Sequence, residues 1–297
     1  MNIASIITRP DNPVLGDTLL AYLASELPRA GLVKWLAPGT AAEIPFVGRG
    51  AALALAWERA TEVIGDLPVD LNIISGINRR KRLLVADMDS TIIQQECVDE
   101  LADLVGKRAE VAAITERAMR GEIEFAGALR ERVALLRGIR EDQVEALLRD
   151  RITATPGAST LVQTMRSHGA YTALVSGGFT LMTGAVAARV GFDEHRGNVL
   201  GLDGGKLSGT LEEPVAGADA KRQAVVELRE RLGLEADDTI AVGDGANDID
   251  MMREAGLSVS FNGKPAVAAA ATARIRHGDM TALLYLQGYS RDEFATG

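Results

Sequence analysis

The feature that most constrains this chain is a short apolar run that ends in two acidic residues. Residues 83–86 read Leu-Leu-Val-Ala, and Asp87 and Asp89 follow at once with one residue between them. The run is too short for an ordinary buried helix and shows no polar alternation, which indicates a strand buried on both faces of a parallel sheet. Ligands of open α/β sheets bind beyond the carboxyl ends of the strands. Asp87 and Asp89 are therefore candidates for a functional site.

Two carboxylates at this spacing suit phosphoryl transfer, although Asp and Ser also occur together in solvated turns. One carboxylate can attack phosphorus to give an aspartyl phosphate, and the other can protonate the leaving oxygen and then activate water. Two anions do not approach a phosphate dianion unaided. A site of this kind therefore also needs a divalent cation, cationic side chains and backbone N–H donors.

Beyond residue 155 the pattern alternates between helices and buried strands, which predicts an α/β fold with a doubly wound parallel sheet. Strands are expected at 171–175, 239–242, 257–261 and 273–276, and a β-hairpin at 198–211. Helices are expected at 158–167, 179–190 and 219–232 and from residues 248, 265 and 279. We expect the core to comprise residues 79–93 and 155–297.

Residues 94–154 interrupt this core with an almost purely helical pattern. Breaks near Gly106, Gly121 and Gly138 predict three or four helices. Because the segment begins directly after the acidic turn, we expect a helical cap above the sheet edge. Such a cap can exclude water and contribute to substrate specificity.

Residues 1–75 differ from the rest and predict a small α+β domain. Strands are expected at 2–7 and 69–74 and helices at 16–27 and 50–64, with a Pro/Gly-rich middle between the helices. No polar cluster of catalytic spacing occurs here, so a packing or regulatory role is expected. The basic residues 79–82 are interpreted as the exposed approach to the central strand.

Three further segments carry polar groups that could complete the site. Ser176-Gly177-Gly178 follows a predicted strand and offers a hydroxyl and backbone donors, although a plain tight turn has the same composition. Lys221 opens an amphipathic helix, where most lysines are solvated. Residues 243–248 read Gly-Asp-Gly-Ala-Asn-Asp after a strand. In this last segment Asp244 could share a cation with Asp87, because Mg²⁺ prefers carboxylate oxygens, and the spacing does not match an EF-hand.

In their order and placement these segments resemble the four motifs of the haloacid dehalogenase superfamily. Dehalogenases proper lack the second aspartate of the first motif, so Asp89 points to phosphoryl transfer. From about Arg79 to the carboxyl terminus the chain resembles the phosphoserine phosphatase family. The resemblance implies a nucleophile at Asp87, a general acid/base at Asp89, and Mg²⁺ held by Asp87, the backbone carbonyl of Asp89, and Asp244. It implies phosphate contacts at Ser176, Gly177, Lys221 and Asn247, with Asp248 as a partner behind them.

The same resemblance implies how the substrate is recognised in the cap. The family places a glutamate after the first motif to meet the substrate ammonium, which falls on Glu96, and a phenylalanine and an arginine seven residues apart, which fall on Phe125 and Arg132. Without the family, each would be interpreted as a solvated or core helix residue. The planar fork of an arginine suits a carboxylate. The implied reaction is hydrolysis of O-phospho-L-serine, the final step of serine biosynthesis.

Two alternatives stay open at this point. One is a related phosphatase or phosphotransferase that acts on phosphothreonine or homoserine. The other is a catalytically idle regulator that binds amino acids, although the carboxylates of the first and fourth motifs are all present. Longer members of the family carry an ACT-type regulatory module before the core, and the strand–helix order of residues 1–75 is compatible with an ACT-like domain.

The composition limits the classes of molecule that this protein is expected to bind. The net charge is −9, no long basic block occurs and aromatic residues make up 4 %, which argues against nucleic-acid binding. Cys97 is the single cysteine, so no internal disulfide is expected, as in a reducing compartment. No apolar run approaches ~18 residues, so no membrane span is expected. We expect a cytoplasmic protein with a small-molecule substrate, and a homodimer is left open.

Overall fold

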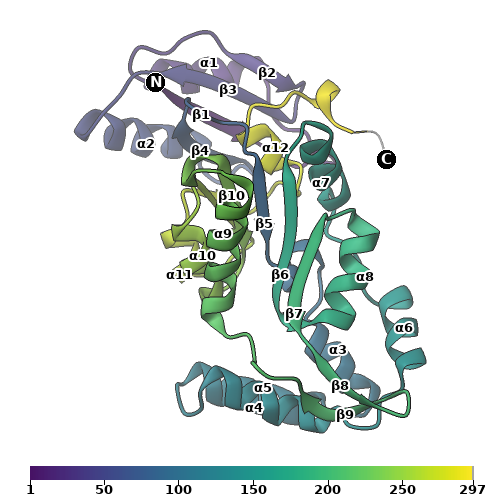
Figure 1. The fold of residues 1–297 in the computed structure, drawn as a ribbon. Helices are drawn as coiled ribbons and strands as arrows, with labels where there is room; N and C mark the ends of the chain where they lie inside the picture. Colours follow the sequence, from purple (N-terminus) through teal and green to yellow (C-terminus); the bar gives the residue numbers. More distant parts are fainter. Residues whose placement is uncertain (296–297) are drawn as a thin grey trace.

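The computed structural model describes residues 1–295 and contains two main sheets (Figure 1). The larger sheet has six parallel strands in the order β12-β11-β10-β5-β6-β7, which confirms the predicted doubly wound α/β fold. Its strands are β5 (Leu83–Ala86), β6 (Tyr171–Phe179), β7 (Glu194–Asn198), β10 (Thr239–Gly243), β11 (Leu257–Phe261) and β12 (Ala273–Ile275). Strand β5 lies near the middle of this sheet.

Helices cover both faces of this sheet, as Figure 1 shows. They are α7 (Ala158–Ser167), α8 (Thr180–Val190), α9 (Ala218–Leu232), α10 (Ile249–Arg253), α11 (Pro265–Ala270) and α12 (Ala282–Leu286). Helices α7, α8 and α12 bury side chains on one face, and α9 and α10 bury theirs on the other. The sheet is therefore the middle of three layers.

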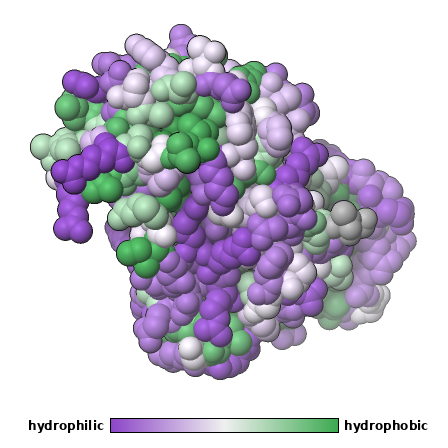
Figure 2. All heavy atoms as spheres, turned by 90° about the horizontal axis from the view of Figure 1, so that it is seen from above, coloured by the Kyte–Doolittle hydropathy of each residue, from purple (hydrophilic) through white to green (hydrophobic). Residues whose placement is uncertain are grey.

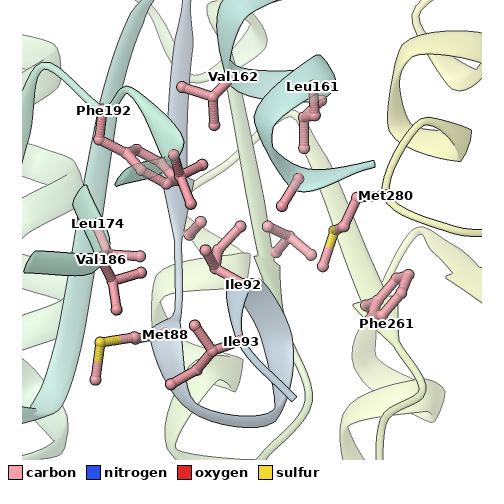
Figure 3. Close-up of a cluster of buried hydrophobic side chains, with 14 of the residues drawn as sticks. Met88, Ile92, Ile93, Leu161, Val162, Leu174, Val186, Phe192, Phe261 and Met280 are labelled. Atoms are coloured by element: carbon pink, nitrogen blue, oxygen red, sulfur yellow. The ribbon is translucent and has the colours of Figure 1, made fainter. Parts of the chain in front are cut away.

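The four residues of β5 are buried because alternate side chains enter different cores. Leu84 and Ala86 join the cluster beneath α7 and α8, whereas Leu83 and Val85 join the cluster beneath α9. Figure 3 shows part of the first cluster, in which residues such as Met88 from the turn after β5 lie near side chains of the helix layer. This double burial explains why the run carries no polar residue.

Four helices and a hairpin lie beyond the carboxyl edge of the sheet. The helices are α3 (Cys97–Leu104), α4 (Arg108–Met119), α5 (Phe125–Leu135) and α6 (Glu141–Asp150). Gly106, Gly121 and Gly138 separate them with φ values of 67°, 76° and 91°, so these predicted breaks are confirmed.

The predicted hairpin forms from β8 (Leu200–Asp203) and β9 (Lys206–Leu211), with Gly204 and Gly205 at its turn. It lies beside these helices rather than on the main sheet (Figure 1). The N–H of Gly138 donates to the carbonyl of Leu207, and the N–H of Leu207 donates to the carbonyl of Ile139, both at 2.8 Å. The chain after β7 therefore contributes to the layer above the sheet edge.

The smaller sheet contains the amino-terminal strands in the order β2-β3-β1-β4, with all neighbours antiparallel. Its elements are β1 (Asn2–Ile7), α1 (Asp17–Glu26), β2 (Lys34–Ala37), β3 (Ala41–Phe46), α2 (Ala51–Ile64) and β4 (Asp70–Ser75). This connection order is the ferredoxin-like one. The expected strands β1 and β4 and helices α1 and α2 are present, whereas β2 and β3 were not expected.

The amino-terminal sheet is buried on both faces. One face packs against α1 and α2 through residues such as Ile6 and Ile44. The other joins the main core through Ile3, Ile7 and Ile74. The molecule is seen from the amino-terminal end in Figure 2, where hydrophobic side chains lie between hydrophilic ones. No helix within residues 1–295 is long and apolar enough to cross a membrane.

The basic residues 79–82 are partly misjudged by the sequence interpretation. Lys81 is buried, and its Nζ donates to the carbonyls of Asn78 and Asp237 at 2.6 Å each. The half-buried guanidinium of Arg79 lies 2.6 Å from the carboxylate of Glu43 on β3. The prediction of an exposed approach is wrong for these two residues, because Lys81 ties the linker to the core and Arg79 joins the amino-terminal sheet to the core.

Candidate active site

The carboxyl ends of β5, β6 and β10 open into a cleft of about 420 Å³, which the helices beyond the sheet edge enclose from the other side. The predicted site residues that line it are Asp87, Asp89, Glu96, Phe125, Arg132, Ser176, Gly177, Lys221, Asp244 and Asn247. Asp248 lies behind this wall and is fully buried. The structure thus brings together side chains that are up to 160 positions apart in the sequence.

The turn after β5 directs two carboxylates toward the cleft. The N–H of Asp87 still donates to the carbonyl of Val242 on β10, so this residue continues the strand. Ser90 adopts a positive φ of 54°, and the chain reverses there. The carboxylate of Asp89 accepts a hydrogen bond from the N–H of Cys97 at 2.9 Å. Burial raises the pKa of Asp89, which favours the protonated form that a general acid needs.

Lys221 connects two acidic residues beneath the cleft. Its Nζ lies 2.6 Å from Oδ1 of Asp87 and 2.6 Å from Oδ1 of Asp248. The other oxygen of Asp248 accepts the N–H groups of Asp244 and Gly245 at 3.1 and 3.0 Å. Burial opposes a charge on Lys221, but the two carboxylates outweigh it and raise the pKa of the ammonium. Lys221 is therefore a fixed cation rather than a solvated one.

The glycines of the β10 loop are required by these contacts. A Cβ at Gly243 would collide with the carboxyl group of Asp248, and a Cβ at Gly245 would collide with the side-chain oxygen of Asn247. Close approach of this kind is a common reason for glycine in a functional loop. The Gly-Asp-Gly-Ala-Asn-Asp pattern thus follows from how tightly the loop folds around its own polar side chains.

Three carboxylates lie close enough to surround a small cation. Single oxygens of Asp87, Asp244 and Asp248 all lie within 4.8 Å of one another. Because both oxygens of Asp248 already accept hydrogen bonds, Asp87 and Asp244 are the better donors. Burial and the charge of Asp248 raise the pKa of Asp244, as expected for carboxylates gathered without a counterion. An all-oxygen set of this kind fits a hard divalent cation such as Mg²⁺.

A bulge in β6 forms the wall opposite these carboxylates. Val175 pairs with Arg196 and Phe179 pairs with Asn198, so residues 176–178 of β6 face a single residue of β7. The hydroxyl of Ser176 accepts the N–H of Gly178 at 2.9 Å and can donate to Asp89 at 3.2 Å. The bulge therefore places a hydroxyl and a short stretch of backbone beside the reactive carboxylates.

The helices beyond the sheet contribute a guanidinium, a carboxylate and an aromatic ring. Arg132 on α5 is half-buried, and its recorded hydrogen bond within residues 1–295 is one of 3.3 Å to the carbonyl of Ala128. Burial lowers the pKa of Arg132, and the charges of Asp99 and Glu96 oppose that effect. Phe125, at the first turn of α5, is 37 % exposed and lies over Gly177, where an added Cβ would be 3.3 Å from the ring.

Glu96 lies at the rim of the cleft and retains solvent contact. Its carboxylate accepts the hydroxyl of Ser90 at 2.7 Å. The surrounding cleft walls, and then the negative charge of Asp89, raise the pKa of Glu96 to about 7. A cationic group in the cleft would lower this pKa and favour the ionised form. The cleft thus holds a carboxylate and a guanidinium on the side of the helices beyond the sheet edge.

Sequence reasoning missed some residues of the cleft. Lys264, after β11, lines it, and its N–H donates to the carbonyl of Asp244 at 3.0 Å. Its position after a predicted strand is the signal that could have identified it. Apolar side chains also line the cleft, among them Val98, Ile123 and Leu129. They follow ordinary helical periodicity, so nothing in the sequence separates them from core residues.

Comparison with known proteins identifies the family. The model of haloacid dehalogenase-like hydrolases matches residues 84–253, which contain the three loops at the cleft. The chain belongs to the haloacid dehalogenase-like hydrolase family. This membership confirms the resemblance found in the sequence, and Asp87 and Asp244 of this hydrolase both fall within the matched range.

Individual relatives extend the comparison. A phosphoserine phosphatase of Albidiferax ferrireducens is 48 % identical over 210 residues, which cover 69 % of this chain and 89 % of that protein. A haloacid dehalogenase family hydrolase of Salmonella enterica has a TM-score of 0.84 at 28 % identity, over 98 % of this chain and 99 % of its own. The solved structure of a phospho-aspartyl intermediate analogue of phosphoserine phosphatase matches with a TM-score of 0.64 at 36 % identity. The match covers 69 % of this chain and 98 % of that chain.

Proposed function

We propose that this hydrolase is a Mg²⁺-dependent phosphatase that converts O-phospho-L-serine to L-serine and phosphate through an aspartyl phosphate. The observation that carries the proposal is the composition of the cleft. Two buried carboxylates and an ammonium lie at the sheet edge, and Glu96 and Arg132 face them from the cap side. A phosphate ester that also bears an ammonium and a carboxylate matches this distribution of charge.

In the proposed reaction Asp87 attacks phosphorus and Asp89 protonates the serine oxygen. Asp87 suits the first role because Lys221 contacts only Oδ1, and within residues 1–295 no hydrogen bond to its other oxygen is recorded. Because its pKa is raised, the carboxyl group of Asp89 can be protonated and can give its proton to the leaving group. After serine departs, Asp89 is ionised and can take a proton from the water that attacks the aspartyl phosphate.

Fixed groups would stabilise the phosphoryl group during transfer. Lys221 would contribute a positive charge, and Ser176, Gly177 and Asn247, which line the cleft, would donate to phosphate oxygens. Asp87, Asp244 and the backbone carbonyl of Asp89 would hold Mg²⁺. When bound, this cation would offset the negative charge that phosphate and the carboxylates bring together.

The cap side would select the substrate. The guanidinium of Arg132 has donors left for a bidentate contact with the substrate carboxylate. Glu96 would receive the substrate ammonium, and Phe125 would shield the ester from bulk water. We propose residues 94–154 as the cap, residues 79–93 and 155–297 as the catalytic core, and residues 1–75 as a separate domain. An ACT-like role for that domain, a homodimer, a cytoplasmic location and a place at the end of serine biosynthesis stay predictions.

The comparisons support the choice of substrate. The relative from Albidiferax ferrireducens is named a phosphoserine phosphatase, and 89 % of its length is matched. The solved phospho-aspartyl intermediate analogue belongs to a phosphoserine phosphatase.

Release of phosphate from a substrate panel tests the proposal. The purified protein is incubated with O-phospho-L-serine, O-phospho-L-threonine, sugar phosphates and nucleotides, with Mg²⁺ or with EDTA. We expect the highest kcat/KM with O-phospho-L-serine and loss of turnover in EDTA that added Mg²⁺ restores. Equal rates with esters that lack an amino-acid group would contradict the substrate assignment. Turnover that EDTA leaves unchanged would contradict the metal dependence.

A further inference from the structure

The buried side chain of Asn198 connects the two backbone segments that carry the phosphate-binding groups. Asn198 ends β7 and is 3 % exposed. Its Nδ2 donates to the carbonyl of Gly177 at 2.9 Å and to the carbonyl of Ala216 at 3.3 Å, and its Oδ1 accepts the N–H of Ala216 at 2.7 Å. One amide thus links the β6 bulge to the segment that leads into α9.

The bulge creates the need for such a partner. Residues 176–178 loop out of the β6–β7 ladder, so their backbone groups lack the regular pairing that the flanking residues have. The hydroxyl of Ser176 accepts the N–H of Gly178, and Asn198 satisfies the carbonyl of Gly177. The carbonyl of Gly177 and the N–H of Gly178 belong to one planar peptide. Fixing the carbonyl therefore also fixes the direction of this backbone donor in the bulge.

The second segment positions Lys221. Ala216 and Gly217 precede α9, and Lys221 lies in its first turns. The ring of Phe125 lies near both segments, because an added Cβ would lie 3.3 Å from the ring at Gly177 and 4.0 Å from it at Gly217. The ring therefore lies near two chain segments, the β6 bulge and the segment before α9, and the hydrogen bonds of Asn198 join these two segments.

We propose that Asn198 is a positioning residue that sets the spacing between the phosphate-binding bulge and the helix that carries Lys221. It does not line the cleft and would act through Gly177 and Ala216. The inference rests on the proposed phosphatase function for its kinetic consequences. Its consequence for phosphate binding can be measured without turnover.

Two substitutions separate the contacts. Asn198→Ala removes all three hydrogen bonds. Asn198→Asp is nearly isosteric and keeps an acceptor for the N–H of Ala216, but it replaces the donor to the carbonyls of Gly177 and Ala216 with an oxygen. If the Gly177 contact matters, the Asp variant should be impaired at least as much as the Ala variant. If Asn198 acts only by accepting the N–H of Ala216, the Asp variant should behave like the wild type.

Asn72 provides a matched control. It is also a buried amide that bonds a backbone N–H and a backbone carbonyl, both of Arg274, but it lies between the two sheets and not at the cleft. Asn72→Ala should lower the thermal midpoint of unfolding and leave the kinetics unchanged. It therefore reports the effect of losing a buried amide alone.

The experiment measures the Kd of inorganic phosphate by calorimetry, and KM and kcat with O-phospho-L-serine, at a temperature where circular dichroism shows each variant folded. Losing the contact should raise the Kd of phosphate about tenfold in Asn198→Ala and at least as much in Asn198→Asp, whereas Asn72→Ala keeps the wild-type value. A wild-type Kd in either Asn198 variant overturns the inference.

Two further results distinguish the possible failures. Should Asn198→Ala fail to fold, the nearly isosteric Asn198→Asp variant carries the test alone. A wild-type protein that releases no phosphate from O-phospho-L-serine refutes the proposed function. The comparison of phosphate Kd values between the Asn198 and Asn72 variants still decides the role of Asn198 in that case.

Discussion

Arg132 differs from Arg130 on the same helix in having no carboxylate partner among residues 1–295. Its neighbour on α5, Arg130, forms an ion pair of 2.6 Å with Glu213 at the surface. Arg132 lines the cleft, and no ion pair is recorded for it among the described residues. A half-buried guanidinium with free donors is costly to the folded protein unless a ligand compensates it. We therefore predict that Arg132 binds the carboxylate of the substrate.

Replacing Arg132 with Lys should raise the KM for O-phospho-L-serine. Lysine keeps the charge but loses the planar pair of donors, and a lost hydrogen bond to a charged group corresponds to about 10- to 100-fold in affinity. Steady-state kinetics measure this effect, with Arg130→Lys as the matched control on the same helix. An unchanged KM in Arg132→Lys would show that the substrate carboxylate binds elsewhere.

The pKa of Glu96 predicts how KM depends on pH. The cleft raises this pKa to about 7, so the carboxyl group is neutral below that pH and ionised above it. Because only the ionised form attracts an ammonium, KM for O-phospho-L-serine should rise as pH falls through 7, by up to about tenfold at one pH unit below the pKa. KM measured from pH 6 to pH 8 provides the test.

The Glu96→Gln variant serves as the control for this pH dependence. The substrate phosphate titrates near pH 6 and affects both enzymes equally. The difference between the two profiles therefore isolates residue 96. Parallel profiles in the wild type and Glu96→Gln would contradict a role of this carboxylate in ammonium binding.

The position of Asp87, Ser176 and Asp244 after predicted strands, and of Lys221 at the start of a helix, made them candidates from the sequence pattern, whereas Glu96 and Arg132 were implied only by the family resemblance. Asp87, Ser176 and Asp244 are adjacent to apolar runs that the topology brings to one edge. Asn198 could not be found in this way. Its function depends on a bulge in the neighbouring strand, and a bulge is a property of pairing between β6 and β7 rather than of either sequence.

Among the elements, the strands that the sequence missed are those with conflicting local signals. In β3, Pro45 argues against a strand, yet β2 pairs with β3 only from Ala41 to Glu43, so the missing N–H lies beyond that pairing. Strand β7, with the sequence Glu-His-Arg-Gly-Asn, is polar because it is the last strand of its sheet. The buried strands had no such conflict, and their predicted bounds agree with the structure to within four residues.

The contact between α5 and the β6 bulge gives a prediction on cap closure. Gly177→Ala places a methyl group 3.3 Å from the Phe125 ring, which is closer than comfortable packing. We expect a fall in kcat/KM of several-fold, because the cap no longer seats fully. The Gly177→Ala/Phe125→Leu double variant should lose less than the sum of the single effects. Strict additivity in this double-mutant cycle would contradict the contact.

On the scale of the whole molecule, the amino-terminal sheet packs directly against the core. Asp70 accepts the N–H groups of Arg276, His277 and Gly278 at 2.7 to 3.2 Å, and Arg79 binds Glu43 and the carbonyls near Leu286. The contacts of Asp70, and those of Arg79 with the carbonyl of Leu286, link residues about 200 positions apart. Sequence patterns could separate the two regions but could not show that they share buried surface.

Asp70→Ala should therefore destabilise the protein without changing its kinetics. The substitution leaves three backbone donors without their acceptor, which costs on the order of 2–3 kcal/mol in the free energy of unfolding. Urea denaturation measures this loss, and KM and kcat serve as the control because Asp70 does not line the cleft. A wild-type unfolding free energy would contradict the role of this interface in stability.

The most direct test of the proposed chemistry is to locate the phosphoryl group during turnover. The enzyme is mixed with O-phospho-L-serine and Mg²⁺, quenched in acid within the first turnover, and digested for mass spectrometry. We expect a phosphoryl group on the peptide that contains Asp87, and neither that group nor released phosphate in a folded Asp87→Asn variant. Turnover by Asp87→Asn at the wild-type rate, or a phosphoryl group on another residue, would contradict Asp87 as the nucleophile.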